Sequence, residues 1–323
     1  MDVNEQPQAR GQDRDGERQR QVAIIGGSGY MGGAVARSLI AHGASVTIVT
    51  RSDRDGGPRP GVTWRRYRTD RPDELAAILT GHDAVINVAG TPIGPRPWTP
   101  ARKRSIRASR IETTRLVVDA LTLIEPERRP AALVNVSGTD RYTNLPGGPA
   151  TEAAPSATGF LADLCRDWEA EAMRAESAGI RVAIVRVGFV IGPGAHILRL
   201  FTLPFRLFLG GPIGSGDQWM SWVHVDDVAE IFALAAVDPR FEGPVNAVAP
   251  EPIHERDLAS AVAGALRRPS WLRVPAFLVR LVMREQATLI LDSRRVAPAR
   301  LAALGYRHRW TELQTAVADA LGR

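Results

Sequence analysis

The first residues along the chain with the types and spacing for chemistry form a glycine-rich turn, Gly26-Gly27-Ser28-Gly29-Tyr30-Met31-Gly32. The turn follows an apolar run at 22–25 and precedes a helical pattern of apolar residues at 34–40. A strand, a glycine turn and a helix in that order leave bare backbone N–H groups where a pyrophosphate can bind the positive end of the helix dipole. The turn predicts a dinucleotide cofactor, although this spacing also occurs in ordinary tight turns. The predicted contacts are Gly26, Ser28, Gly29, Tyr30, Met31 and Gly32.

The second strand of such a fold ends where the adenosine ribose binds. Residues 45–49 read as that strand, and Thr50 and Arg51 follow it. An acidic residue there would accept hydrogen bonds from a free 2′-hydroxyl, whereas a guanidinium can bind a 2′-phosphate through two hydrogen bonds. Arg51 therefore favours NADP(H) over NAD(H), the alternative being an ordinary exposed arginine in an arginine-rich chain.

The spacing of apolar runs and helical patterns predicts the elements that position these residues. Strands are expected at 22–25, 45–49, 62–67, 84–88, 132–136 and 181–187, with helical patterns between them. Apolar strands alternating with amphipathic helices indicate an α/β fold, a doubly wound parallel sheet of the Rossmann type. Residues 21–192, completed by 222–249, form the predicted nucleotide-binding core. A smaller substrate lobe is expected from 193–221 and 250–323, and residues 1–20 read as a disordered tail.

Composition narrows the classes of partner. Lys and Arg outnumber Asp and Glu by 41 to 35, but no basic stripe interleaved with aromatic residues or nucleic-acid-binding module is apparent, so we expect no nucleic-acid partner. Cys165 is the only cysteine, which excludes an intrachain disulfide and a thiolate cluster for zinc, and no metal is predicted. The apolar runs at 201–211 and 271–283 contain Arg and Pro, so we interpret them as a pocket wall and a packing helix and expect no membrane contact. We expect a cytoplasmic monomer or homodimer that takes a small-molecule substrate.

Motifs along most of the chain then identify a family resemblance. Residues 21–323 resemble the atypical extended short-chain dehydrogenase/reductases, and more narrowly the epimerase family proteins with a C-terminal domain of the DUF1731 type. The resemblance implies NADP(H) in an extended Rossmann site, lined by Thr50, Arg51, Val88, Ala89, Arg110 and Val190. The motifs that carry it are the glycine turn, Thr50-Arg51, Asn87-Val88-Ala89-Gly90, Trp98-Thr99, Ser109-Arg110, Trp168-Glu169, Phe205-Arg206-Leu207, the stretch 210–216, Trp222-Val223-His224, Arg267-Arg268-Pro269 and Val296-Ala297-Pro298.

The catalytic residues of that superfamily are only partly matched. Its usual members use a Tyr and a Lys four residues later, but the sole lysine here, Lys103, follows Thr99 at that spacing. At the expected place, 160–169, there is no tyrosine. The remaining candidates follow the fifth strand: Ser137 or Thr139 would orient the reacting oxygen, and Tyr142 or a water would supply the proton. Alternatively, Ser137 and Thr139 satisfy local backbone groups, and Tyr142 is a packed loop residue with its hydroxyl in water.

Further polar residues carry weaker expectations. Arg206, Gln218 and Trp222 are candidates for substrate binding, with packing of the small lobe as the alternative, which is favoured for the tryptophan. His224 could carry a proton, but the sequence favours a strand-to-helix entry in which Asp226 or Asp227 caps N–H groups. Cys165 could form a thiolate beside Arg166, although burial is the default for a lone cysteine.

Three functions remain open on this sequence. The first is an NADP(H)-dependent oxidoreductase or epimerase acting on a small carbonyl or hydroxyl compound, possible sugar-like or secondary-metabolite substrates included. The second is a catalytically silent NADP(H)-binding scaffold or regulator, which the missing Tyr/Lys pair keeps open. The third is a non-redox isomerase, dehydratase or cyclase on the same scaffold. The fold alone does not choose among them.

Overall fold

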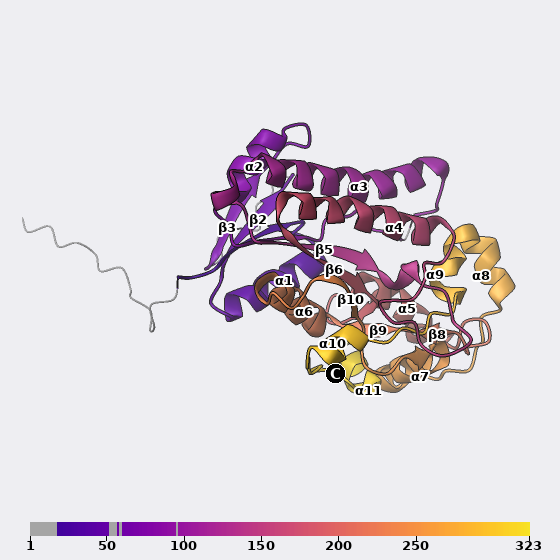
Figure 1. Cartoon of the computed structure of the whole chain (residues 1–323). Coiled ribbons are helices and arrows are strands. Elements are labelled where there is room, and N and C mark those ends of the chain that lie inside the picture. The colour runs from indigo at the N-terminus through magenta and orange to yellow at the C-terminus, as the bar shows by residue number, and fades with distance from the viewer. Residues whose placement is uncertain (1–17, 52–56, 58–59, 95) are drawn as a thin grey trace, which may run out of the picture.

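A central parallel sheet organises the molecule (Figure 1). The computed structural model describes residues 18–51, 57, 60–94 and 96–323. In the sheet the strand order is β10-β6-β5-β4-β1-β2-β3, and every neighbouring pair is parallel. All six strands predicted from the sequence are therefore present, and β10 adds a seventh to the sheet. They are β1 (Gln21–Ile25), β2 (Ser45–Thr50), β3 (Val62–Arg66), β4 (Ala84–Asn87), β5 (Ala132–Gly138), β6 (Arg181–Val187) and β10 (Gly243–Ala247).

Helices cover both faces of the sheet, which confirms the doubly wound architecture. In Figure 1 the helices α2 (Pro72–Leu79), α3 (Pro100–Leu123) and α4 (Phe160–Met173) lie above the sheet. On the opposite face lie α1 (Tyr30–Ala41) and α6 (Val225–Val237). Alternate residues of each strand point to opposite faces, so a strand buried on both sides must be apolar at every position.

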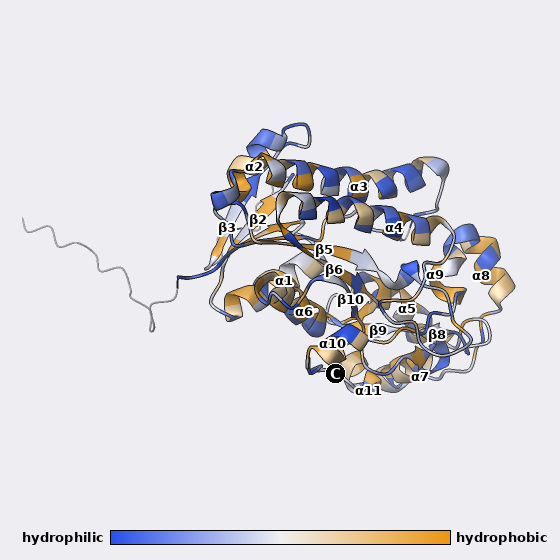
Figure 2. Cartoon of the chain, in the orientation of Figure 1, coloured by the Kyte–Doolittle hydropathy of each residue, from blue (hydrophilic) through white to orange (hydrophobic). Residues whose placement is uncertain are grey.

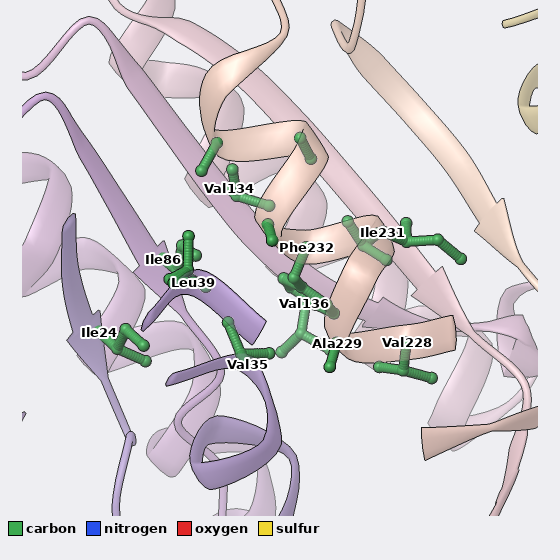
Figure 3. Packing of buried hydrophobic residues seen from close by; sticks show 14 of the residues in the cluster. Ile24, Val35, Leu39, Ile86, Val134, Val136, Val228, Ala229, Ile231 and Phe232 are labelled. Carbon is green, nitrogen blue, oxygen red and sulfur yellow. The ribbon is translucent and has the colours of Figure 1, made fainter. Parts of the chain in front are cut away.

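Strand β1 shows this division of side chains. Ile24 joins the cluster formed with α1 and α6, shown in Figure 3, where it lies near Val35 and Leu39. Its neighbour Ile25 joins the cluster on the other face, against α2 and α3. The continuous apolar run of this strand thus fills two cores at once.

Smaller strands and further helices lie outside the seven-stranded sheet. Strand β7 (Phe189–Ile191) pairs in parallel with β9 (Trp222–His224), and β8 (Trp219–Met220) pairs antiparallel with β11 (Ile253–His254). Helices α5 (His196–Arg206), α7 (Glu255–Leu266) and α11 (Leu313–Ala320) share a third apolar cluster. The remaining helices of the C-terminal part are α8 (Ala276–Met283), α9 (Thr288–Leu291) and α10 (Ala299–Ala303).

One stretch of the predicted small lobe packs against the core. Leu301 of α10 belongs to the same cluster as the sheet and α6. The carboxylate of Asp227, buried at the start of α6, accepts hydrogen bonds from Arg309 N at 2.8 Å, Trp310 N at 3.0 Å and the Tyr306 hydroxyl at 2.8 Å. The domain boundary predicted at 250 does not separate this stretch from the core, because the chain returns to pack against the core after residue 250.

The predicted disordered tail lies outside the described residues except for 18–20. Within that short part, the Arg18 guanidinium lies 2.6 Å from the Asp83 carboxylate, and Ser45 N donates to Arg20 O at 2.8 Å. These contacts extend the ordered chain slightly upstream of β1.

Candidate cofactor and substrate site

The glycine turn is packed too closely for side chains at two positions. Gly26 has φ +85°, and a Cβ placed there would lie 2.8 Å from Ala89 Cα in the neighbouring loop. A Cβ on Gly32 would lie 2.7 Å from Gly27 Cα and would also contact the Gly26 carbonyl oxygen. Real Cβ contacts are longer, so the first turn of α1 can lie against the end of β1 only with glycines at these positions.

The start of α1 leaves its backbone donors open toward the sheet edge. Gly29 is the N-cap and, lacking a side chain, makes no capping hydrogen bond. Ser28 is exposed, Met31 is half-buried, and the Tyr30 ring packs beside the loop at 192–194, since a Cβ on Gly192 would lie 2.9 Å from the Tyr30 hydroxyl. Unfilled N–H groups at the N-terminus of a twelve-residue helix form the kind of cradle that binds a pyrophosphate.

Thr50 and Arg51 lie at the carboxyl end of β2. Thr50 is buried and pairs with Arg66 of β3, whereas Arg51 is exposed. The Arg51 charge lies close enough to lower the pKa of the Tyr67 phenol, which burial raises by a larger amount. The guanidinium is thus near the sheet edge and accessible, while the loop that follows, 52–56, lies outside the described residues.

A buried polar network fixes the end of β4. Asn87 donates to Asn135 Oδ1 at 2.7 Å and to Thr114 Oγ1 at 2.9 Å, and Trp168 donates to the same threonine at 2.8 Å. The free amide oxygen of Asn87 accepts Ala89 N at 3.2 Å. Because buried polar groups with complete partners hold a single geometry, this network sets the backbone of the Val88-Ala89 loop.

Arg110 supplies a buried cation beside that loop. Its guanidinium donates to Thr91 O at 3.1 Å and Ile106 O at 3.2 Å, and a Cβ on Gly90 would lie 3.1 Å from its Cζ. Burial lowers the Arg110 pKa to about 10, so the side chain stays charged at neutral pH. Val190 is half-buried in β7. These placements bring the predicted cofactor residues from several strands to one edge of the sheet, as expected for this topology.

The Ser137 hydroxyl is engaged in a buried ion-pair network. It donates to Glu169 Oε1 at 2.7 Å. Glu169 also receives two hydrogen bonds from Arg186, Nε to Oε1 and Nη2 to Oε2, both at 2.8 Å. All three residues are almost completely buried. A charge pair removed from water needs such complete hydrogen bonding, so Ser137 has a structural partner independent of any substrate.

The Tyr142 hydroxyl is hydrogen-bonded to other side chains of the protein. Its side chain is 1% exposed, and its hydroxyl donates to Asn246 at 2.9 Å and accepts a hydrogen bond from Arg186. Burial raises the Tyr142 pKa, with the Arg186 charge opposing this. The packed alternative placed this hydroxyl in water, whereas in the structure it is hydrogen-bonded to Asn246 and Arg186. Its proton is directed at Asn246.

A cleft of about 720 Å³ lies beside Tyr142, which is one of its lining residues, whereas Ser137 does not line it. Its walls come from the turn after β5, the start of α4 and residues 285–294, and both Asp140 and Arg294 belong to its lining. The Arg294 guanidinium is 3.3 Å from the Asp140 carboxylate. Asp140 also lies near Arg110 and Cys165, because its charge raises the pKa of both groups. Thr139, which precedes Asp140, is buried.

The predicted substrate residues are divided between surface and interior. Arg206 is exposed at the end of α5. Gln218 is buried and donates to Ile213 O at 2.9 Å, tying the 210–216 loop in place. Trp222 is 1% exposed within the third apolar cluster, with its indole N–H donating to Glu251 O at 3.2 Å. This placement favours the packing alternative for Trp222, and neither buried side chain lines the cleft.

His224 and Cys165 have structural surroundings. His224 is itself the N-cap of α6: its Nδ1 accepts Asp226 N at 3.2 Å, while Nε2 lies 3.1 Å from Asp319. The expected cap by Asp226 or Asp227 is thus wrong, because the imidazole fills that position. Burial lowers the His224 pKa and raises the Cys165 pKa to about 12, so the thiol remains protonated.

Sequence reasoning missed four residues that organise the site: Asp140, Glu169, Arg186 and Arg294. Arg186 did carry a signal, since a charged residue inside the apolar run 181–187 requires a buried partner. Asp140 and Arg294 carried none, because they are 154 positions apart and meet only in the folded chain. Among the described residues, no group of three His, Cys, Asp or Glu side chains could hold a metal ion.

The chain has the features of a Rossmann nucleotide-binding protein. They are a glycine-rich turn, polar residues at the end of the second strand and a cleft, all at one edge of a doubly wound sheet. The family model described as NAD dependent epimerase/dehydratase family matches residues 22–248, and the model described as domain of unknown function DUF1731 matches 274–320. The chain belongs to the NAD dependent epimerase/dehydratase family. The predicted family resemblance, including its C-terminal domain, is confirmed.

Relatives align over nearly the whole chain. The human epimerase family protein SDR39U1 is 35% identical over 304 residues, covering 92% of this chain and 98% of that protein. The Bacillus subtilis (strain 168) epimerase family protein YfhF is 32% identical over 304 residues, covering 93% and 97%. The crystal structure of human SDR39U1 (isoform 2) with NADPH is similar with TM-score 0.83 and 34% identity, covering 94% of this chain and 99% of that one.

Relatives of this chain are not confined to one compartment. An Arabidopsis thaliana homologue, 33% identical over 302 residues and covering 93% of this chain and 86% of that protein, is named chloroplastic. A cytoplasmic location for this chain therefore stays a prediction. No helix in the described ranges is long and apolar enough to cross a membrane.

Proposed function

We propose that this chain binds NADP(H) at the glycine turn and uses it to oxidise, reduce or epimerise a small carbonyl or hydroxyl compound. The observation that carries the proposal is the meeting of three features at one sheet edge: the glycine-rich turn, Arg51 and the cleft beside Asp140. The crystal structure of the human relative with NADPH supports the choice of cofactor.

The residues present fit such a cofactor. A methyl group on Gly26 or Gly32 would collide with backbone, so the cradle must stay open, and the N-cap Gly29 leaves its donors to a ligand. Arg51 would bind the 2′-phosphate through charge-assisted hydrogen bonds. Val88 and Ala89, held by Asn87, would lie along the cofactor, with Arg110 behind them as a buried positive charge.

When bound, the nicotinamide would supply the acceptor or donor of a hydride. The protein must then hold the substrate oxygen and move its proton. We assign the proton transfer to Asp140, because its carboxylate lies in the cleft and Arg294, 3.3 Å away, holds it in place. As a substrate hydroxyl becomes a carbonyl, Asp140 would accept the hydroxyl proton, and it would return that proton in the reverse direction.

The hydroxyl residues after β5 take different parts in this proposal. Thr139, next to Asp140 in the chain, is the candidate for orienting the substrate oxygen. Ser137 and Tyr142 are positioning residues, because both of their hydroxyls belong to the Arg186–Glu169 network that supports the turn carrying Asp140. Arg206 remains the candidate for an anionic part of a larger substrate, since it is exposed.

The test compares Asp140→Asn with Asp292→Asn. Both carboxylates line the cleft and contact Arg294, but only Asp140 lies near Arg110. Oxidation of NADPH would be followed with a panel of aldehydes, ketones and nucleotide sugars. We expect Asp140→Asn to bind NADPH normally and to lose roughly 100-fold in turnover, with Asp292→Asn near the wild-type rate. Full turnover by Asp140→Asn would show that Asp140 does not transfer the proton.

A second candidate is an NADP(H)-binding scaffold without turnover. The occupied hydroxyls of Ser137 and Tyr142, together with the missing Tyr/Lys pair, favour it. Tight NADPH binding without oxidation by any member of the panel would support this function over the catalytic one. A non-redox reaction would instead consume substrate while the NADPH absorbance stayed constant.

A further inference from the structure

The exposed apolar side chains of this protein are concentrated on one part of its surface. Of the large hydrophobic residues that are exposed in the described chain, all but Tyr30 and Leu123 come from α5, α8 and the segments beside them. We name these the apolar surface. It consists of Ile197, Leu200, Leu203, Leu207, Phe208, Leu209, Trp271, Leu272, Phe277, Leu278, Leu281 and Val282.

The two helices are apolar on sides that no described element covers. In α5, Leu198, Thr202 and Phe205 face the interior, yet Leu203 on the outer side is 53% exposed. In α8 only Val279 is buried, while Leu281 and Val282 are 72% and 80% exposed. Figure 2 shows α8 at the edge of the molecule with apolar residues along much of its length. The packing-helix interpretation of 271–283 is therefore wrong.

Backbone and side-chain contacts join the two helices into one surface. The Trp271 indole N–H donates to Phe208 O at 3.1 Å, and Leu272 N donates to Gly210 O at 3.2 Å. The Arg268 guanidinium lies 4.3 Å from the centre of the Phe208 ring. The segment after α5 thus lies beside the segment before α8, which makes the exposed residues neighbours.

The charged side chains within the two chain segments that carry this surface are basic. No Asp or Glu occurs between Glu176 and Asp217, or between Asp257 and Glu285. Seven exposed arginines lie in these stretches next to the apolar residues, and none of them forms an ion pair with a described residue. They are Arg199, Arg206, Arg267, Arg268, Arg273, Arg280 and Arg284.

A second copy of this chain is a poor occupant of such a surface. A two-fold interface brings the same patch against itself, so the seven arginines would meet each other with no carboxylate between them. An anionic lipid surface offers an apolar phase for the hydrophobic side chains and negative charge for the arginines. Apolar side chains enter the region between headgroups and acyl chains, while arginines extend to the phosphates. The ring of Trp271, anchored through its N–H and 65% exposed, suits that boundary.

We propose that the apolar surface binds peripherally to anionic phospholipid membranes, through short helices that lie on the bilayer and do not span it. This replaces the sequence-based expectation of no membrane contact. The proposal is independent of catalysis, because none of the apolar-surface residues lines the cleft beside Asp140.

The test uses the full chain and sedimentation with vesicles. Phosphatidylcholine vesicles are compared with vesicles that contain phosphatidylglycerol, at low and high salt. We expect binding only to the anionic vesicles, weaker at high salt. The double variants Phe277→Ser/Leu281→Ser and Arg280→Gln/Arg284→Gln should each weaken binding about tenfold or more, since one removes apolar contacts and the other removes charge.

Matched controls come from other exposed positions. Leu123→Ser and Arg307→Gln/Arg323→Gln change the same residue types outside the apolar surface and should bind as wild type. Circular dichroism and NADPH affinity report whether each variant is folded. The proposal is overturned if the wild-type chain does not bind anionic vesicles. It is also overturned if either double variant of the apolar surface binds them as well as wild type does. So does light scattering that shows a dimer which the patch variants dissociate, because the surface would then be a subunit interface.

Discussion

Glu255 gives the stability of the fold a specific pH dependence. The side chain is completely buried at the start of α7, and its one hydrogen bond is from Ile213 N to Oε2 at 2.9 Å. Its other oxygen has no partner among the described residues. Burial raises the Glu255 pKa from 4.5 to about 7, and the Ile213 hydrogen bond opposes this only in part. The protonated form is therefore the one that fits the interior.

The sign and size of the effect follow from that pKa. Burial raises the pKa of Glu255 in the folded state. Its contribution to the free energy of unfolding is therefore fully present below pH 4.5 and is lost as the pH rises through about 7. A difference between 4.5 and about 7, at 1.36 kcal/mol per pKa unit, corresponds to about 3 kcal/mol. Glu255→Gln keeps a neutral side chain of the same shape, so it should not lose this contribution.

Denaturant unfolding at pH 5 and pH 8 measures the difference. We expect Glu255→Gln to unfold at higher denaturant than wild type at pH 8 and to differ little at pH 5. Glu251→Gln, at an exposed position close in sequence, should show no such pH-dependent gain. Equal wild-type and Glu255→Gln stabilities at pH 8 would refute the reasoning, since the buried carboxylate would then have no cost.

Three further substitutions test other parts of the structure. Gly32→Ala should weaken NADPH at least tenfold because its Cβ would collide with the end of β1, whereas Gly33→Ala, whose Cβ has no neighbour closer than 3.8 Å, should bind NADPH normally in the same calorimetric titration. Tyr142→Phe should lower thermal stability by about 1–3 kcal/mol through the lost Arg186 and Asn246 contacts but keep turnover; a large loss of turnover at unchanged affinity would restore its catalytic role. Asp227→Asn should destabilise the fold by about 2–4 kcal/mol and expose the C-terminal stretch to protease, because it weakens the acceptor for Arg309, Trp310 and Tyr306. Unchanged proteolysis would show that these hydrogen bonds do not hold the C-terminal stretch in place.

The sheet and the glycine turn were predictable because their signals are local. Most core strands are short apolar runs buried on both faces, and the turn is a contiguous motif between a strand and a helix. The positions at strand ends then follow from topology, since parallel strands bring their carboxyl ends to one edge. Thr50, Val88 and Ser137 could be placed at that edge without knowing any side-chain contact.

The polar interior was not predictable in the same way. Tyr142 receives its partners from β6 and β10, so only the folded chain shows that its hydroxyl is occupied. Asp140 and Arg294 likewise come together in the cleft lining from distant positions in the chain. The apolar pattern of α5 was ambiguous, because apolar residues occupy both its inner side and its outer side, and periodicity alone does not say which side is covered.

Calorimetric titration of the wild-type chain and Arg51→Ala with NADPH and NADH tests the central claim most directly. The claim is that the turn after β1 and the arginine after β2 together hold a nicotinamide dinucleotide with a 2′-phosphate. We predict that wild type prefers NADPH, and that Arg51→Ala weakens NADPH about 10- to 100-fold while leaving NADH nearly unchanged. Absence of heat and of thermal protection with either coenzyme would contradict the account.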